Sequence, residues 1–144
     1  MSSDHVNPVK SPDGGAGRPD LLTLGAILVS FVLMGWNGFM KLASYQIEID
    51  IFTALGLEPA GRYLVGVAEI VAVILLLIPR TRFLGAVLTL GIMVGAIGSH
   101  LSGKIGLGGI WMALLVSAAA IWIGWQHRDQ APWIGRRARG NAEA

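Results

Sequence analysis

Apolar residues dominate four long stretches of the chain, and short polar turns separate the last three of them. The stretches predict helices over residues 21–45, 59–78, 82–101 and 107–126, each close to the roughly 20 residues that a helix needs to cross the hydrocarbon core of a bilayer. Short turns make consecutive helices antiparallel neighbours. Residues 21–126 are therefore predicted to form one all-α membrane domain, an antiparallel bundle of four transmembrane helices.

The connection at residues 41–61 is long for a membrane hairpin and has a pattern of its own. It predicts a short interfacial helix that begins at Asp50 as the N-cap and ends at Gly56 in the left-handed conformation. One apolar face of this helix carries Ile51, Phe52 and Leu55. Two interpretations stay open: a lid over the outer mouth of the bundle, or an ordinary helix on the membrane surface.

Both ends of the chain are polar. Gly, Pro and short polar side chains fill residues 1–20, and such a composition buries too little apolar surface to offset the entropy lost on ordering, so we expect a disordered arm. Residues 127–144 form a basic tail that suits the anionic lipids of an inner leaflet. The tail lies beside a membrane domain and has no aromatic series and no folded module, so nucleic acid is not expected as a partner.

The basic residues are distributed unevenly between the two sides of such a bundle. The side with both termini carries eight of them and the other side carries three. On the first side lie Lys10, Arg18, Arg80, Arg82, Arg128, Arg136, Arg137 and Arg139, and on the other Lys41, Arg62 and Lys104. By the positive-inside rule, both termini of this multi-pass protein are predicted to be cytoplasmic.

The composition fits a membrane protein and excludes several kinds of site. Charged residues make up 14% of the chain, whereas soluble domains have about 25%. The chain contains no cysteine, which excludes disulfide relays, thiolate metal sites and iron–sulfur clusters within it. We expect no metal site. Because no complete redox site is present, we also do not expect the chain to be an enzyme on its own.

Four polar residues of the predicted membrane helices are candidates for one cluster: Asn37, Lys41, Glu69 and His100. An acid at the centre of a membrane helix costs about 2.5–3.5 kcal/mol even on lenient insertion scales, so Glu69 needs a compensating partner. A helical Cα–Cβ bond tilts toward the N-terminus of its helix, so Lys41 leans into the membrane and Glu69 leans outward, and the two can meet. The four side chains are predicted to converge in the outer half of the bundle.

Three interpretations of this polar cluster stay open. Lys41 and Glu69 can form a buried ion pair that only fixes the register of the helices. Alternatively, the cluster lines a small pocket in which Glu69 and His100 exchange protons with a bound quinone, while Lys41 or Asn37 holds a carbonyl oxygen. The third interpretation is passage of a small solute or a lipid, which four short helices would achieve only as an oligomer.

Small residues recur at every fourth position on the last two helices, a spacing that lets helix backbones approach closely. The two series are Gly91, Gly95 and Ser99, and Gly109, Ala113 and Ser117. They predict tight packing of the third membrane helix on the fourth. The competing interpretation is that one series forms the interface of a homo-oligomer.

The chain resembles the DoxX-like family in several of these motifs, over roughly residues 21–124. The motifs are Gly38-Phe-Met-Lys41, the segment from Phe52 to Pro59, Gly66-Val-Ala-Glu69, Pro79-Arg-Thr-Arg82 and the end of the third helix from Ala96 to His100. The resemblance implies a small bacterial inner-membrane protein of four helices, with Lys41, Glu69 and His100 as characteristic polar positions. It further implies an accessory or quinone-contacting subunit of a membrane redox system, with a separate redox partner.

Overall fold

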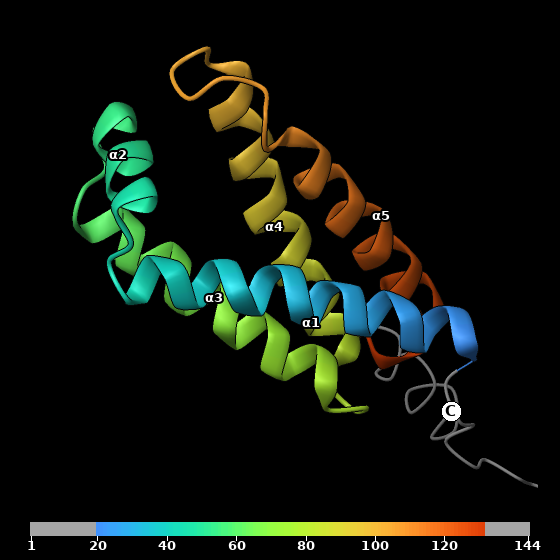
Figure 1. Cartoon of the computed structure of the whole chain (residues 1–144). Helices are drawn as coiled ribbons and strands as arrows, with labels where there is room; N and C mark the ends of the chain where they lie inside the picture. Colours follow the sequence, from blue (N-terminus) through green and yellow to red (C-terminus); the bar gives the residue numbers. More distant parts are fainter. Residues whose placement is uncertain (1–19, 132–144) are drawn as a thin grey trace, which may run out of the picture.

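The computed structural model describes residues 20–131, which form five α-helices and one short 3-10 helix and contain no strand. The helices are α1 (Leu21–Leu42), α2 (Gln46–Leu55), α3 (Ala60–Leu77), α4 (Arg82–Leu101), α5 (Ile110–Gln126) and η1 (Arg128–Gln130) (Figure 1). Residues 1–19 of the predicted arm at 1–20, and residues 132–144 of the predicted tail at 127–144, lie outside the described residues.

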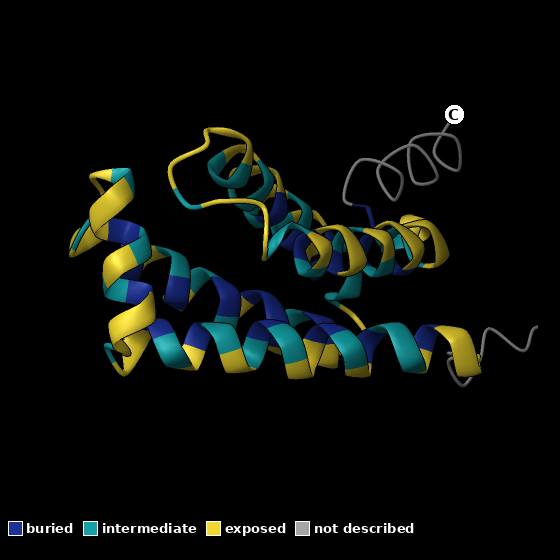
Figure 2. Cartoon of the chain, turned by 45° about the horizontal axis from the view of Figure 1, so that its top comes forward, coloured by how far each residue is buried: buried dark blue, intermediate teal, exposed yellow. Residues whose placement is uncertain are grey.

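The four long helices form two antiparallel pairs, α1 with α3 and α4 with α5 (Figure 1). The pairs meet at the end that holds the start of α1, the α3–α4 turn and the end of α5, and they separate toward the end that holds α2 (Figures 1 and 2). Buried apolar side chains of the helices pack together in two clusters. The buried core consists of Ile27, Met34, Ala72, Val73, Leu76, Ala86, Met93, Ala113, Val116 and Ile123.

Large apolar side chains cover the outside of the described helices, including Val32, Val67, Val94 and Trp125. α1, α3 and α4 are long and apolar enough to cross a membrane, and α5 is an apolar helix of 17 residues, about 25 Å long. In water such a surface would be an aggregation hazard, whereas lipid is its natural solvent. The predicted helical membrane bundle is confirmed.

The first two helices differ from the prediction at their junction. α1 ends at Leu42, not at residue 45, because Ser44 adopts a positive φ of 57° that no α-helix can contain. α2 then begins at Gln46, four residues before the predicted N-cap Asp50. The Asp50 carboxylate instead accepts a hydrogen bond from Gln46 Nε2 at 2.8 Å. The left-handed Gly56, with a φ of 75°, is confirmed.

The last membrane helix starts at Ile110, three residues later than predicted. Gly106 has a φ of 71°, and the glycines that follow have a low helix propensity, so the turn extends to Gly109. The other predicted starts are close: α4 begins at Arg82, and α3 begins just after Pro59. Asp20 caps α1, and its Oδ1 accepts a hydrogen bond from Thr23 N at 3.0 Å.

The small residues of α4 do not all make the close helix contact that their spacing predicts. Gly91 and Gly95 are exposed, and a Cβ placed on either would meet no atom within 4 Å. The close contact on this side is made by Gly109, where an added Cβ would lie 2.9 Å from the His100 ring. Ser99 and Ser117 each donate to the carbonyl four residues earlier within their own helix. Gly91 and Gly95 therefore border open space, because the two helix pairs have already separated at their level.

Candidate functional site

A cleft of about 1030 Å³ lies between the two helix pairs at the α2 end of the bundle. All five α-helices and the α4–α5 loop contribute to its wall, which is mostly apolar. The polar side chains in the wall are Asn37, Lys41, Glu48, Glu69, Ser99 and His100. A large apolar cavity with a few polar groups is typical of a site for a small molecule.

Two glycines bring the charged residues of the cleft together. Where α1 crosses α3, a Cβ on Gly38 would lie 3.1 Å from Gly66 O, and a Cβ on Gly66 would lie 3.2 Å from Gly38 O. The backbones are thus in contact at this crossing. Lys41 and Glu69 each follow one of these glycines by three residues, so their side chains project from the crossing toward each other.

Lys41 is held between two carboxylates. Its Nζ lies 3.3 Å from Glu69 Oε2 and 3.5 Å from Glu48 Oε2. All three side chains are buried, with 10%, 6% and 7% of the Lys41, Glu69 and Glu48 side chains exposed. The predicted meeting of Lys41 with Glu69 is confirmed. The position of Lys41 in the last turn of α1 also places its charge where the helix dipole favours a cation.

These buried charges are not balanced among themselves. One ammonium faces two carboxylates, and Glu69 Oε2 receives no hydrogen bond from any described residue, although Lys41 Nζ is close enough for an ion pair. A buried acceptor without a donor costs roughly 1–3 kcal/mol, and more when it is charged. A buried acceptor without a hydrogen-bond donor on the wall of a large cleft marks this position as a candidate ligand contact.

Glu48 is a further cleft residue that was not predicted from the sequence. It was assigned to an irregular connection, whereas α2 starts early enough to include it in the first turn. Glu48 and Phe52 are spaced i, i+4, and both are buried on the face of α2 that lines the cleft. The sequence signal that could have identified Glu48 is its position four residues before an aromatic residue, which places both on one face of a helix. Of the two interpretations of this short helix, its position in the cleft wall favours the lid.

The role of Arg62 was also not predicted from the sequence, where this residue counted only as a positive charge on the outer side. Its guanidinium donates to both carboxylate oxygens of Glu58 at 2.8–3.0 Å, to Ser44 Oγ at 3.0 Å and to the carbonyl of Lys41. It also stacks on the Tyr63 ring, 4.3 Å from the centroid. Arg62 therefore satisfies a carbonyl at the end of α1 and fixes the backbone of Lys41. The i, i+4 spacing of Glu58 and Arg62 was the only hint of it.

Asn37 and His100 line the same cleft but do not join the ion-pair cluster. Asn37 Nδ2 donates to Leu33 O at 2.8 Å, within its own helix. His100 Nδ1 lies 2.7 Å from Gly106 O, so the histidine closes the α4–α5 turn. The predicted group of four thus divides into the paired Lys41 and Glu69, now with Glu48, and two polar groups elsewhere on the wall.

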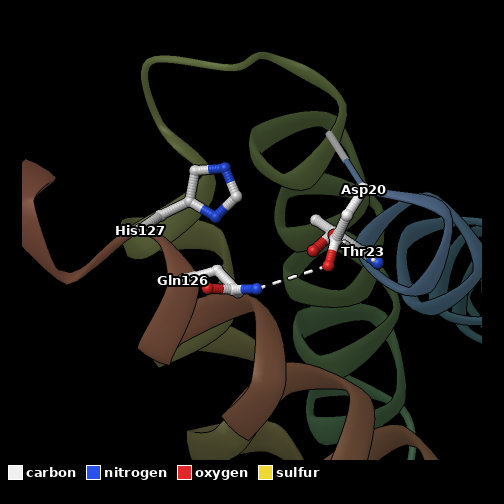
Figure 3. Close-up of a pocket in the computed structure, with 4 residues that line it drawn as sticks. All are labelled: Asp20, Thr23, Gln126 and His127. Carbon is white, nitrogen blue, oxygen red and sulfur yellow. Dashed lines mark hydrogen bonds between the residues drawn. The ribbon is translucent and has the colours of Figure 1, made fainter. Parts of the chain in front are cut away.

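A smaller pocket of about 260 Å³ lies at the opposite end, lined by Asp20, Thr23, Gln126 and His127 (Figure 3). Gln126 Nε2 donates to Asp20 Oδ2 at 3.5 Å, and Trp122 Nε1 donates to Thr23 Oγ1 at 3.2 Å. Hydrogen bonds from Thr23, the largest cause, hold the pKa of Asp20 below its ordinary value. These contacts join the start of α1 to the end of α5, and we regard the pocket as part of that joint.

Comparison with known proteins places the whole bundle within one family. Residues 23–124 match the model of the DoxX-like family, and they include every charged residue of the cleft. No curated protein and no solved structure matched the chain significantly. Between residues 20 and 131, no group of three or more His, Cys, Asp or Glu side chains is arranged to hold a metal ion.

Proposed function

Because this chain belongs to the DoxX-like family, we propose that it is a multi-pass protein of the bacterial cytoplasmic membrane that contacts a quinone as an accessory subunit of a membrane redox system. The observation that carries the proposal is the cleft of about 1030 Å³ with the Lys41 cluster in its wall. The family and the fold establish a helical membrane bundle. The bacterial cytoplasmic membrane, the redox system and the quinone are proposed.

The cleft has the size and the chemistry for a membrane-soluble quinone. Most ligand pockets measure about 300–1,000 Å³, so this volume suits a head group with part of an isoprenoid tail. Apolar side chains such as Leu33, Ile92 and Val116 offer a surface for the tail. The unsatisfied Glu69 Oε2 offers a polar contact for the head.

The residues of this chain would bind and orient the ligand and exchange protons with it. Lys41 has three N–H donors, so its ammonium can face a ligand oxygen while it stays within ion-pair distance of both carboxylates. Asn37 keeps a second N–H besides the one given to Leu33 O. Glu69 and His100 are the groups able to hold a proton at the wall. The quinone, when bound, supplies the electron chemistry, and the separate redox partner supplies or removes the electrons.

A purely structural role is the alternative with an observation in its favour. The Lys41–Glu69 pair sits where the backbones of α1 and α3 touch, so it is well placed to fix their register. A pair that serves only packing needs no cleft beside it. Blocking the cleft while leaving the pair intact therefore separates the two roles.

Native mass spectrometry of the protein, extracted gently from its own membrane, tests the proposal. We expect a bound mass that matches a quinone, or a co-purifying oxidoreductase. The Gly95→Leu variant would fill the cleft, because Gly95 lines it and has no neighbour within 4 Å of an added Cβ. The matched control is Gly98→Leu on the same helix, which also has free space but is outside the cleft wall.

The quinone mass should be lost in Gly95→Leu and kept in Gly98→Leu. A wild-type protein that carries only phospholipid, with no redox protein attached, would contradict the proposal and favour the structural role.

A further inference from the structure

We infer that the cleft prefers a head group that donates hydrogen bonds, and hence binds the reduced quinol more tightly than the oxidised quinone. This inference rests on the proposed function, since it concerns the redox form of the same ligand. It follows from counting which hydrogen-bonding capacities of the cleft wall are already used and which remain free.

The charged cluster offers more acceptors than donors. Two carboxylates, Glu48 and Glu69, have four oxygens between them, whereas the Lys41 ammonium has three N–H groups. The surplus is visible at Glu69 Oε2, which lies 3.3 Å from Lys41 Nζ but receives no hydrogen bond from the described residues. Its side chain is 6% exposed, so bulk water cannot freely replace the missing donor.

The other strong donor next to this cluster is committed elsewhere. The guanidinium of Arg62 is used by Glu58, by Ser44 and by the Lys41 carbonyl, all away from Glu69. Within residues 20–131, no other lysine or arginine makes an ion pair with Glu48 or Glu69. The deficit of donors at Glu69 is therefore not met from this part of the protein.

His100 adds a second acceptor to the wall. Its Nδ1 lies 2.7 Å from Gly106 O, and because a carbonyl only accepts, Nδ1 carries the hydrogen. In the neutral ring Nε2 then has a free lone pair. The Cε1–Nε2 edge lies over Gly109, which also lines the cleft.

A ligand head that complements Glu69 and His100 must bring donors, and it can also accept from the second N–H of Asn37. The hydroxyl groups of a quinol both donate and accept hydrogen bonds, whereas the carbonyl groups of a quinone only accept. Placed near Glu69 Oε2, a quinone carbonyl would set one electron-rich oxygen against another, while a quinol hydroxyl would supply the missing donor. One hydrogen bond to a charged group corresponds to a preference of about tenfold or more.

The test is equilibrium binding of decyl-ubiquinol and decyl-ubiquinone to the full chain in lipid nanodiscs, with the quinol kept reduced under argon. We expect the quinol to bind about tenfold more tightly, which would raise the midpoint potential of the bound two-electron couple by about 30 mV. In Glu69→Gln, whose amide both donates and accepts, most of this preference should disappear. Asp50→Asn, an exposed change outside the cleft wall, should keep it.

The outcomes separate this inference from the proposal beneath it. Equal binding of the two forms, or tighter binding of the quinone, would overturn the preference and leave quinone contact standing. Specific binding of neither form to a folded wild-type protein would overturn both. The central comparison needs no variant, so a poorly folded Glu69→Gln protein would not obscure the result.

Discussion

Lys41 is the residue that makes the two buried carboxylates tolerable. It lies within ion-pair distance of both Glu48 and Glu69, and no other described lysine or arginine pairs with either of them. Removing the cation leaves two like charges in a low dielectric. Removing Glu69 instead leaves Lys41 and Glu48 as a balanced pair. Removing Lys41 should therefore lower the stability of the bundle more than removing Glu69.

We predict that Lys41→Met destabilises the bundle by about 3–5 kcal/mol, the range for breaking a buried pair, and that Glu69→Gln costs much less. The stabilities of the two variants can be compared by heating each protein in mild detergent and measuring the fraction that stays monodisperse on size-exclusion chromatography. Lys104→Met, at an exposed lysine of the α4–α5 loop, is the control and should resemble the wild type. Equal losses in Lys41→Met and Glu69→Gln would show that the balance of charge is not what matters.

The polar residues illustrate what could be predicted from the sequence and what could not. The high cost of an intramembrane acid, with the Cβ directions of two helices, was enough to predict the meeting of Lys41 and Glu69. Glu48 and Arg62 were missed because their roles depend on where α1 ends. That end depends on the positive φ of Ser44, a conformation that hydropathy does not encode.

At the scale of elements, the α1–α3 crossing is the contact on which the site depends. A Cβ added at Gly66 would lie 3.0 Å from Lys41 Cβ and 3.2 Å from the Gly38 carbonyl. The carbonyl belongs to the backbone and cannot move aside cheaply. Even one methyl group at this position must therefore push the helices apart or shift Lys41.

We predict that Gly66→Ala destabilises the protein by about 1–3 kcal/mol, the usual cost of overpacking, and loosens the Lys41–Glu69 pair. Gly98→Ala, with no neighbour within 4 Å of its added Cβ, should be neutral or stabilise the helix by up to about 1 kcal/mol. Unfolding transitions of the two variants in the same detergent provide the comparison. If both variants behaved alike, the close crossing of α1 and α3 would be refuted.

Helix positions followed well from the sequence wherever proline or charge marks an end, as at the start of α4. The predicted packing of α4 on α5 is present, but the contact expected at two of the α4 glycines is not. The spacing of Gly91 and Gly95 predicted a close helix contact, yet both glycines border the cleft. The spacing of residues shows which of them lie on the same face of a helix. What packs against that face depends on how far apart the two helix pairs are at that level.

At the scale of the whole molecule, the two helix pairs meet at one end and separate at the other (Figure 2). The cleft lies between them at the end where they separate. The described chain begins and ends at the closed end, together with the α3–α4 turn (Figure 1). The excess of basic residues on that side predicts that it faces the cytoplasm. The cleft and α2 would then lie in the outer half of the membrane.

The cysteine-free sequence allows a direct test of this orientation. We predict that a membrane-impermeant maleimide added to intact spheroplasts labels a Lys104→Cys variant and spares an Arg80→Cys variant until the membrane is permeabilised. The two positions lie in the turns at opposite ends of the bundle. The reverse pattern would invert the orientation, and labelling of both positions in sealed cells would contradict the four-helix crossing.

Photolabelling of the protein in nanodiscs with a photoactivatable short-tail quinone tests directly whether the cleft binds a quinone. We predict adducts on the cleft wall, in segments 33–41, 47–55 and 88–100, and we expect excess unlabelled quinone to suppress them. We also predict that these adducts are lost in Gly95→Leu and kept in Gly98→Leu. Adducts confined to the lipid-facing surfaces, unaffected by competitor or by filling the cleft, would contradict the claim that this cleft is the binding site.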